Sequence, residues 1–180
     1  LVGIKYGTMT NAAFVSTGGP KADSGIMSFD GSGDYITFDN HSDFEITGSA
    51  GYAIEAWVYP TSDSESYGGI IGCTQHTSGG AGSSSINWQL YRSSGVFRMY
   101  GGTDLDVSTA ACANNAWWHG TLGISSISPK IGRADFNYHA HAGEAEFTGY
   151  MGPIRLYKNK ALTAAEVQQN YIATKGRFGL

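Results

Sequence analysis

Apolar and polar residues alternate along much of this chain, in short runs separated by segments rich in glycine, serine and aspartate. In residues 52–60, YAIEAWVYP, both alternating faces carry apolar side chains, which predicts a strand in the middle of a sheet. Near the C-terminus, Ile154 and Leu156 alternate with Arg155 and Tyr157. This period of two predicts a second clear strand with one buried face.

Shorter runs of the same kind recur roughly every ten residues. They predict strands at 26–29, 35–38, 69–73, 86–91, 96–100, 105–109 and 117–124. The first two flank Asp-Gly-Ser-Gly-Asp at 30–34, which predicts a hairpin-type connection because glycine supplies positive φ and aspartate bonds its own backbone. Residues 1–20 have no clean periodicity, and we interpret them as a lead-in to a single domain that spans 1–180.

The pattern changes after Tyr157. Thr163 and Glu166 have the Thr-x-x-Glu spacing of a capping box, in which each side chain satisfies a backbone amide at a helix start. A helix is therefore expected to begin near Ala164. Gly176 is expected to end it in a left-handed cap.

Many short strands followed by one helix predict an all-β fold, an antiparallel two-sheet jelly-roll sandwich with one short C-terminal helix. The composition agrees, because 26 glycines and 13% aromatic residues suit tight turns and aromatic sheet faces. At 180 residues, the chain is long enough for one domain with a sizeable core.

The charge pattern limits the kinds of partner that the chain is expected to bind. The net charge is −4, and the eleven Lys and Arg are scattered without a basic run, which disfavours a nucleic-acid partner. No window approaches the ~20 apolar residues of a membrane helix, so no membrane insertion is expected. The chain starts with Leu and lacks the pattern of a signal peptide, so we expect it to have been processed or cut from a longer protein.

Cys73 and Cys112 are the only cysteines. Cys73 lies in the apolar run GIIGC, where a buried free thiol that packs as a small hydrophobe is the favoured interpretation. A disulfide between the two cysteines is the alternative.

Four segments carry a family resemblance. They are IMSFDGSGDYITF at 26–38, YAIEAWVYP at 52–60, the Trp118-His119 strand start followed by PKIGR at 129–133, and the closing strand and helix with Asn170-Tyr171. In this order they resemble laminin-G-like domains of the concanavalin A-like lectin/glucanase superfamily. The C-terminal sequence from Asn170 onwards is similar to that of such domains in structural proteins of tailed phages, particularly marine phages.

The chain departs from that pattern at one place. Laminin-G-like domains usually continue after the Trp-His strand through a hairpin with an Asn-Gly turn, whereas only residues 120–128 intervene here. Two explanations remain open: the domain has lost a strand pair and gained a different sheet edge, or the chain lacks residues at this point.

Catalysis has no motif in its favour. Glucanases of the superfamily use Glu-x-Asp-x-x-Glu on one strand, and this chain has no such sequence. The nearest pairs are Glu144 and Glu146, Asp104 and Asp106, and Asp63 and Glu65, each without a third carboxylate. We therefore expect a protein that is not an enzyme.

Metal binding is also weakly indicated, and no cofactor is expected. His139 and His141 have a spacing that would point two imidazoles the same way, but exposed loop histidines are the simpler interpretation. Many relatives place an acidic residue for calcium before the closing strand, where this chain has Gly152-Pro153. The remaining calcium candidates are Asp30, Asp34 and Asp104, and turn formation explains the first two.

Sugar binding requires aromatic faces beside hydrogen-bonding side chains. Candidates lie on one strand, in its flanking loops and in a late loop: Trp88, Gln89, Tyr91, Tyr67, His76, Tyr138, His139 and His141. Core packing is the competing interpretation for the four tryptophans, Trp57, Trp88, Trp117 and Trp118.

The resemblance implies a non-catalytic adhesion or carbohydrate-binding module of a larger assembly, such as a phage tail fibre, tail tip or capsid decoration protein. The expected partners are a cell-surface glycan or other virion subunits, at a virion surface or extracellular location, with homo-oligomers as in phage appendages. The alternative is a purely structural interaction module of the virion without sugar binding, and a glycoside hydrolase is a third interpretation.

Overall fold

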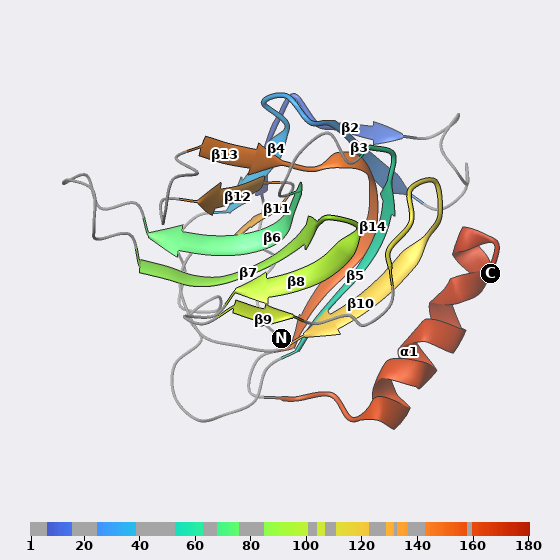
Figure 1. The fold of residues 1–180 in the computed structure, drawn as a ribbon. Helices are drawn as coiled ribbons and strands as arrows, with labels where there is room; N and C mark the ends of the chain where they lie inside the picture. The colour runs from blue at the N-terminus through green and yellow to red at the C-terminus, as the bar shows by residue number, and fades with distance from the viewer. Residues whose placement is uncertain are drawn as a thin grey trace.

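Two antiparallel sheets face each other, and one helix lies on the outside of the smaller of them (Figure 1). The computed structural model describes residues 7–15, 25–38, 53–62, 68–75, 85–100, 104–106, 111–122, 129–131, 133–136, 143–157 and 160–180. The predicted antiparallel sandwich with a short C-terminal helix is confirmed.

The five-stranded sheet contains both strands with the clearest sequence patterns. Its order is β10 (Trp118–Leu122), β5 (Ala53–Pro60), β14 (Thr148–Tyr157), β3 (Ile26–Asp30) and β2 (Ala13–Val15). β5 lies between β10 and β14, which confirms its predicted central position. β10 is an edge strand of this sheet among the described residues, and residues 123–128 that follow it lie outside the described part.

The seven-stranded sheet forms the other layer. Its order is β1 (Gly7–Thr10), β4 (Tyr35–Phe38), β11 (Pro129–Ile131), β6 (Gly68–Gln75), β7 (Ser85–Ser93), β8 (Val96–Tyr100) and β9 (Asp104–Asp106). β12 (Arg133–Phe136) pairs with β13 (Gly143–Glu146), and this small ribbon lies beside β6.

The main core lies between the two sheets and follows from strand alternation. Ile54, Ala56 and Val58 point from β5 to the inside, where they join Ile71 and Leu90 of the opposite sheet in one buried cluster. Removing such side chains from water is the main favourable term in folding, at about 25 cal/mol per Å² of apolar surface.

The outer face of β5 is also apolar, and the C-terminal helix covers it. The Trp57 ring stacks on Tyr171 of α1 (Ala164–Lys175), with centroids 5.6 Å apart. It also stacks on Phe178, at 4.3 Å, while Trp117 packs in the same buried cluster. The prediction that tryptophans belong to the core is thus confirmed for Trp57 and Trp117.

The helix begins as predicted and ends differently. Thr163 and Glu166 form both hydrogen bonds of the capping box. The predicted left-handed cap at Gly176 is wrong, because Gly176 has φ −60° and starts a 3₁₀ turn, η1 (Gly176–Phe178). Gly179, with φ 77°, takes the left-handed conformation instead. The extra turn brings Phe178 onto Trp57, a tertiary contact that the local sequence does not contain.

The predicted hairpin at 30–34 is also wrong. β3 and β4 belong to different sheets, so the connection crosses from one layer to the other. The turn chemistry itself is confirmed, since Gly31 and Gly33 have φ values of 83° and 76°.

Residues 1–20 contain more than a lead-in. β1 and β2 follow each other in the chain and form one edge of each sheet, so this connection crosses between the layers as well. The two crossings are bonded together, because the Asn11 amide donates to the Gly33 carbonyl at 3.1 Å.

Cys112 is a buried free thiol, which rules out the disulfide alternative in this structure. Cys73 lies in β6, and its side chain is outside the described part. In the described part of the chain, no helix is long and apolar enough to cross a membrane.

Candidate functional site

The structure describes only some of the predicted sugar-binding residues. Trp88 and Gln89 lie in β7, where they pair with Cys73 and Gly72 of β6, and their side chains are outside the described part. The Tyr91 side chain is only 2% exposed, which supports a packing role. The other candidates, Tyr67, His76, Tyr138, His139 and His141, lie outside the described residues.

The strands that border those candidates can nevertheless be compared. β6 ends at Gln75, one residue before His76, and β12 ends at Phe136, two residues before Tyr138. The two strands lie beside each other and point toward the same end of the molecule (Figure 1). In the sequence, Tyr67 precedes the first residue of β6, whereas His76 follows its last residue.

An acidic turn occupies one corner of the sandwich, where β3 crosses to β4. The Asp30 carboxylate accepts from the Ser32 amide at 2.7 Å, and the Asp34 carboxylate accepts from the Asp30 amide at 2.6 Å. Glu146, at the end of β13, accepts from the Gly33 amide. Burial raises the pKa of Asp34, and the neighbouring Asp30 and Glu146 charges add to that rise.

These bonds bear on the calcium candidates. Asp30 and Asp34 both have the turn-forming roles that their sequence predicts. Asp104 lies in β9, at the opposite edge of the seven-stranded sheet from β1 and β4, so the fold does not bring the three together. Within the described ranges, no group of three His, Cys, Asp or Glu side chains is arranged to hold a metal.

A small pocket opens beside this corner. It is lined by Ser62, Gly68, Arg92, Glu146, Phe147 and Thr148. Its free space suits about one water molecule, so it is too small for a sugar ring.

Arg92 braces the loops around this pocket, a role that the sequence did not indicate. Its side chain is buried, and both Nε and one terminal nitrogen donate to the Cys112 carbonyl, at 3.1 and 2.7 Å. The other terminal nitrogen donates to the Ser62 carbonyl at 3.3 Å. Arg92 therefore fixes two loops that are far apart in sequence.

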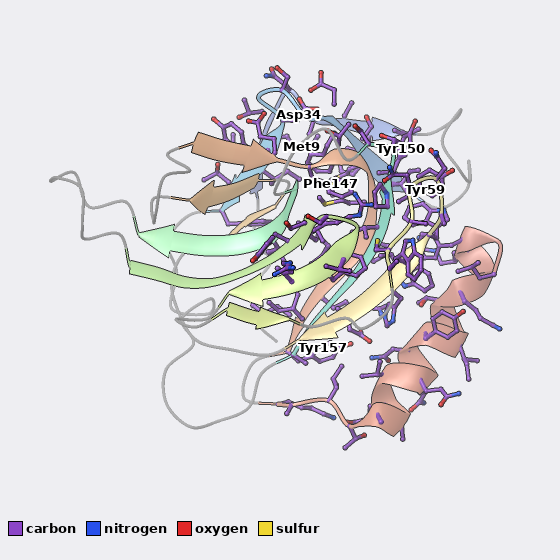
Figure 2. The ribbon with its side chains drawn as sticks, viewed as in Figure 1. Met9, Asp34, Tyr59, Phe147, Tyr150 and Tyr157 are labelled. Carbon is purple, nitrogen blue, oxygen red and sulfur yellow. The ribbon has the colours of Figure 1, made fainter. Side chains whose placement is uncertain are left out.

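A second polar cluster lies at the other end, under the helix. Glu55 of β5 is only 1% exposed, although it is charged in water. Its carboxylate accepts from the Tyr157 hydroxyl at 2.8 Å and from the Asn170 amide at 2.9 and 3.0 Å. Figure 2 shows Tyr157 at the opposite end of the view from Asp34, so this cluster is distinct from the acidic turn.

Two basic side chains complete the cluster, which we call the Glu55 network: Glu55, His119, Arg155, Tyr157 and Asn170. An Arg155 terminal nitrogen lies 3.4 Å from one Glu55 oxygen, and His119 Nε2 lies 3.4 Å from the other. The His119 contact is close but lacks hydrogen-bond geometry, so that buried nitrogen has no hydrogen-bond partner.

The environment shifts two pKa values in the network. Burial lowers the pKa of His119, and the nearby Arg155 charge lowers it further, while Glu55 opposes both effects. Burial and the hydrogen bond to Glu55 raise the pKa of the Tyr157 hydroxyl. Burial thus favours the neutral form of the imidazole beside the enclosed Glu55 carboxylate.

The Glu55 network ties the helix to the sheet. Its members come from β5, β10, β14 and α1, and Glu55 itself is buried. Glu55 lies two residues before Trp57 on β5, but its partner Asn170 is 115 positions away, so no local spacing revealed the cluster.

Two antiparallel sheets packed face to face, with one helix outside, define an all-β sandwich. No protein-family model matches the chain, and no curated protein sequence matches it. Solved structures share the fold. A structure of Trypanosoma rangeli sialidase in complex with 2,3-difluorosialic acid has a TM-score of 0.58 and 12% identity over 84% of this chain and 28% of that chain.

A second similar structure is the crystal structure of HCR/D-Sa-GBL1/C, with a TM-score of 0.55 and 10% identity. It covers 94% of this chain and 47% of its own. The chain thus spans about a quarter of the sialidase and about half of the other protein. At these identities, the likeness establishes the β-sandwich fold.

Proposed function

We propose that the chain is a non-catalytic carbohydrate-binding or adhesion module of a larger assembly, of the kind found in phage tail fibres, tail tips or capsid decoration proteins. The observation that carries this proposal is the common direction of β6 and β12. It supports a glycan site at the end of the molecule where His76 follows β6 and where Tyr138, His139 and His141 follow β12. An aromatic ring beside imidazole donors is a common composition for a sugar site.

The virion assignment rests on the resemblance of the C-terminal segment to phage structural proteins. It places the module at a virion or other extracellular surface, in homo-oligomers, where several weak sugar contacts would act together. The sialidase and HCR/D-Sa-GBL1/C are other proteins. The sialidase complex with 2,3-difluorosialic acid suggests sialylated glycans as the first ligands to test.

The decisive experiment is a glycan-array screen of the purified protein with and without calcium, with its mass in solution measured in parallel. Specific binding that is lost in Tyr138→Ala or Trp88→Ala would support the proposal. Phe14→Ala is the matched control, because Phe14 is 72% exposed on β2, in the other sheet, and its loss should leave binding unchanged.

A purely structural module of the virion is the second candidate, and the burial of Tyr91 favours it. An aromatic residue inside the sheet packing is unavailable to a sugar. A folded protein that binds no glycan on the array, yet forms a defined oligomer or binds virion subunits, would establish this alternative.

A glycoside hydrolase is the third candidate, and its carboxylates would be Glu144 and Glu146. Glu146 already accepts the Gly33 amide, which gives it a structural role. Hydrolysis of a sialoside or another glycoside by the protein, lost in Glu144→Gln or Glu146→Gln, would overturn the non-catalytic proposal.

A further inference from the structure

His119 of β10 is a buried side chain that the helix covers and that can bind a proton. The His119 side chain is 6% exposed. Its ring centroid lies 4.9 Å from that of Trp57 on the neighbouring strand and 5.9 Å from that of Tyr171 on α1. Its Nε2 is buried without a hydrogen bond. The helix therefore covers an ionisable group whose polar atom is left unsatisfied.

Among the described residues, the charged and titratable groups that face His119 come from three elements. β5 contributes Glu55, 3.4 Å from Nε2. β14 contributes Arg155, 3.4 Å from Glu55, and the Tyr157 hydroxyl that bonds Glu55. α1 contributes Tyr171, with Lys175 Nζ 5.7 Å from its ring centroid.

Glu55 attracts a proton on His119, whereas Arg155 and the absence of water oppose it. When the helix is docked, the second effect is stronger, since burial is the largest influence on this imidazole. Lifting α1 would remove Tyr171 from the imidazole and Asn170 from Glu55, and water would reach both groups. The undocked form therefore holds a proton on His119 more readily than the docked form.

We propose that His119 is an acid-sensitive latch beneath the helix: α1 and η1 stay on the five-stranded sheet while its covered imidazole is neutral, and its protonation on acidification releases them. Release uncovers the outer apolar cluster of Trp57, Tyr171 and Phe178, because the last two leave with the helix. The helix is suited to this, since Thr174 is its only buried residue.

The direction with pH follows from linkage. The docked form has a His119 pKa below 6.5, the ordinary value. Docking is therefore at full strength above pH 6.5 and weakens as the pH falls toward the lowered pKa. One linked proton changes the docking equilibrium by at most about tenfold per pH unit.

Hydrogen exchange of the whole chain between pH 7.5 and 5.0 tests the latch. Protection factors of the α1 amides are expected to fall below pH 6.5, by up to about tenfold per unit, while those of β7 and β8 stay constant. Constant protection in α1, or an equal fall in β7 and β8, would overturn the proposal.

His119→Gln should abolish the pH dependence of α1 protection, because it keeps a polar side chain and removes the titration. Phe14→Ala, at an exposed position on β2, is the control and should leave the pH dependence intact. Should His119→Gln not fold, the imidazole NMR titration of the unaltered protein decides: a His119 pKa at or above 6.5 overturns the latch, and a lower one supports it.

Discussion

At the scale of single residues, the least expected feature is a carboxylate enclosed between a helix and a sheet. Glu55 has lost water on all sides, and the Tyr157 hydroxyl and Asn170 amide replace it. Burial of a charge is tolerated only when such partners are in place.

Glu55→Ala should lower the free energy of unfolding by about 3 kcal/mol, because Arg155, Tyr157 and Asn170 would lose their shared acceptor. Urea denaturation followed by far-ultraviolet circular dichroism measures the change. Phe14→Ala serves as the surface control. A loss no larger than that of the control would show that the network contributes nothing to stability.

For Asp34, removing the charge is expected to leave the stability at pH 7 unchanged or higher. Its pKa is raised above 3.8 in the folded protein, so its contribution to stability is full below pH 3.8 and is lost as the pH rises through the raised value. Asp34→Asn keeps an oxygen for the Asp30 amide and cannot ionise. We expect the variant to be at least as stable as the original protein at pH 7, and the difference to shrink at pH 4. Lower stability of the variant at pH 7 would contradict this reasoning.

At the scale of elements, the parts that the sequence predicted are those with local causes. The capping box needs only Thr163 and Glu166, three positions apart, and β5 shows its central position by apolar residues on both faces. The end of the helix was mispredicted because Phe178 stacks on Trp57, which lies 121 residues earlier in the chain. The hairpin failed likewise, since turn residues fix a local bend and do not determine which sheet receives the next strand.

The candidate sites also differ in whether their contacts are local or long-range in sequence. The bonds within the acidic turn could be predicted, because Asp30 and Asp34 act on neighbouring amides. The Glu55 network could not, because its members come together only when β5, β10, β14 and α1 are packed.

Thr163→Ala should lower the free energy of unfolding by about 1 kcal/mol, because the Glu166 amide loses its capping oxygen. Thr163→Ser should restore most of it, and thermal denaturation compares the three proteins. Equal stability of the alanine and serine variants would mean that the cap is unimportant.

The same cap has a pH dependence. The Lys160 ammonium, together with Thr163, lowers the pKa of Glu166 to about 2. Its contribution is therefore present above pH 4.5 and is lost as the pH falls toward 2. Charge-removing Glu166→Gln should flatten that part of the stability profile.

At the scale of the whole molecule, helix and sheet fit closely enough to exclude one methyl group. A Cβ on Gly152 would lie 2.9 Å from the Phe178 ring and 3.1 Å from Trp57 Cβ. Gly152→Ala should therefore displace Phe178 and cost about 1–3 kcal/mol, measured by urea denaturation.

Gly176→Ala is the matched control for Gly152→Ala. Nothing lies within 4 Å of its Cβ position, and its φ of −60° suits alanine. We expect no loss and a gain of up to about 1 kcal/mol. Equal destabilisation by the two substitutions would show that close packing against Phe178 is not the cause.

Two connections between the sheets lie at the same corner of the sandwich. The chain passes between the layers twice at one corner, after β1 and after β3, and the bond from Asn11 to Gly33 joins the two passages. We therefore expect parting of the two sheets to be resisted at this corner, because the two passages would have to move together.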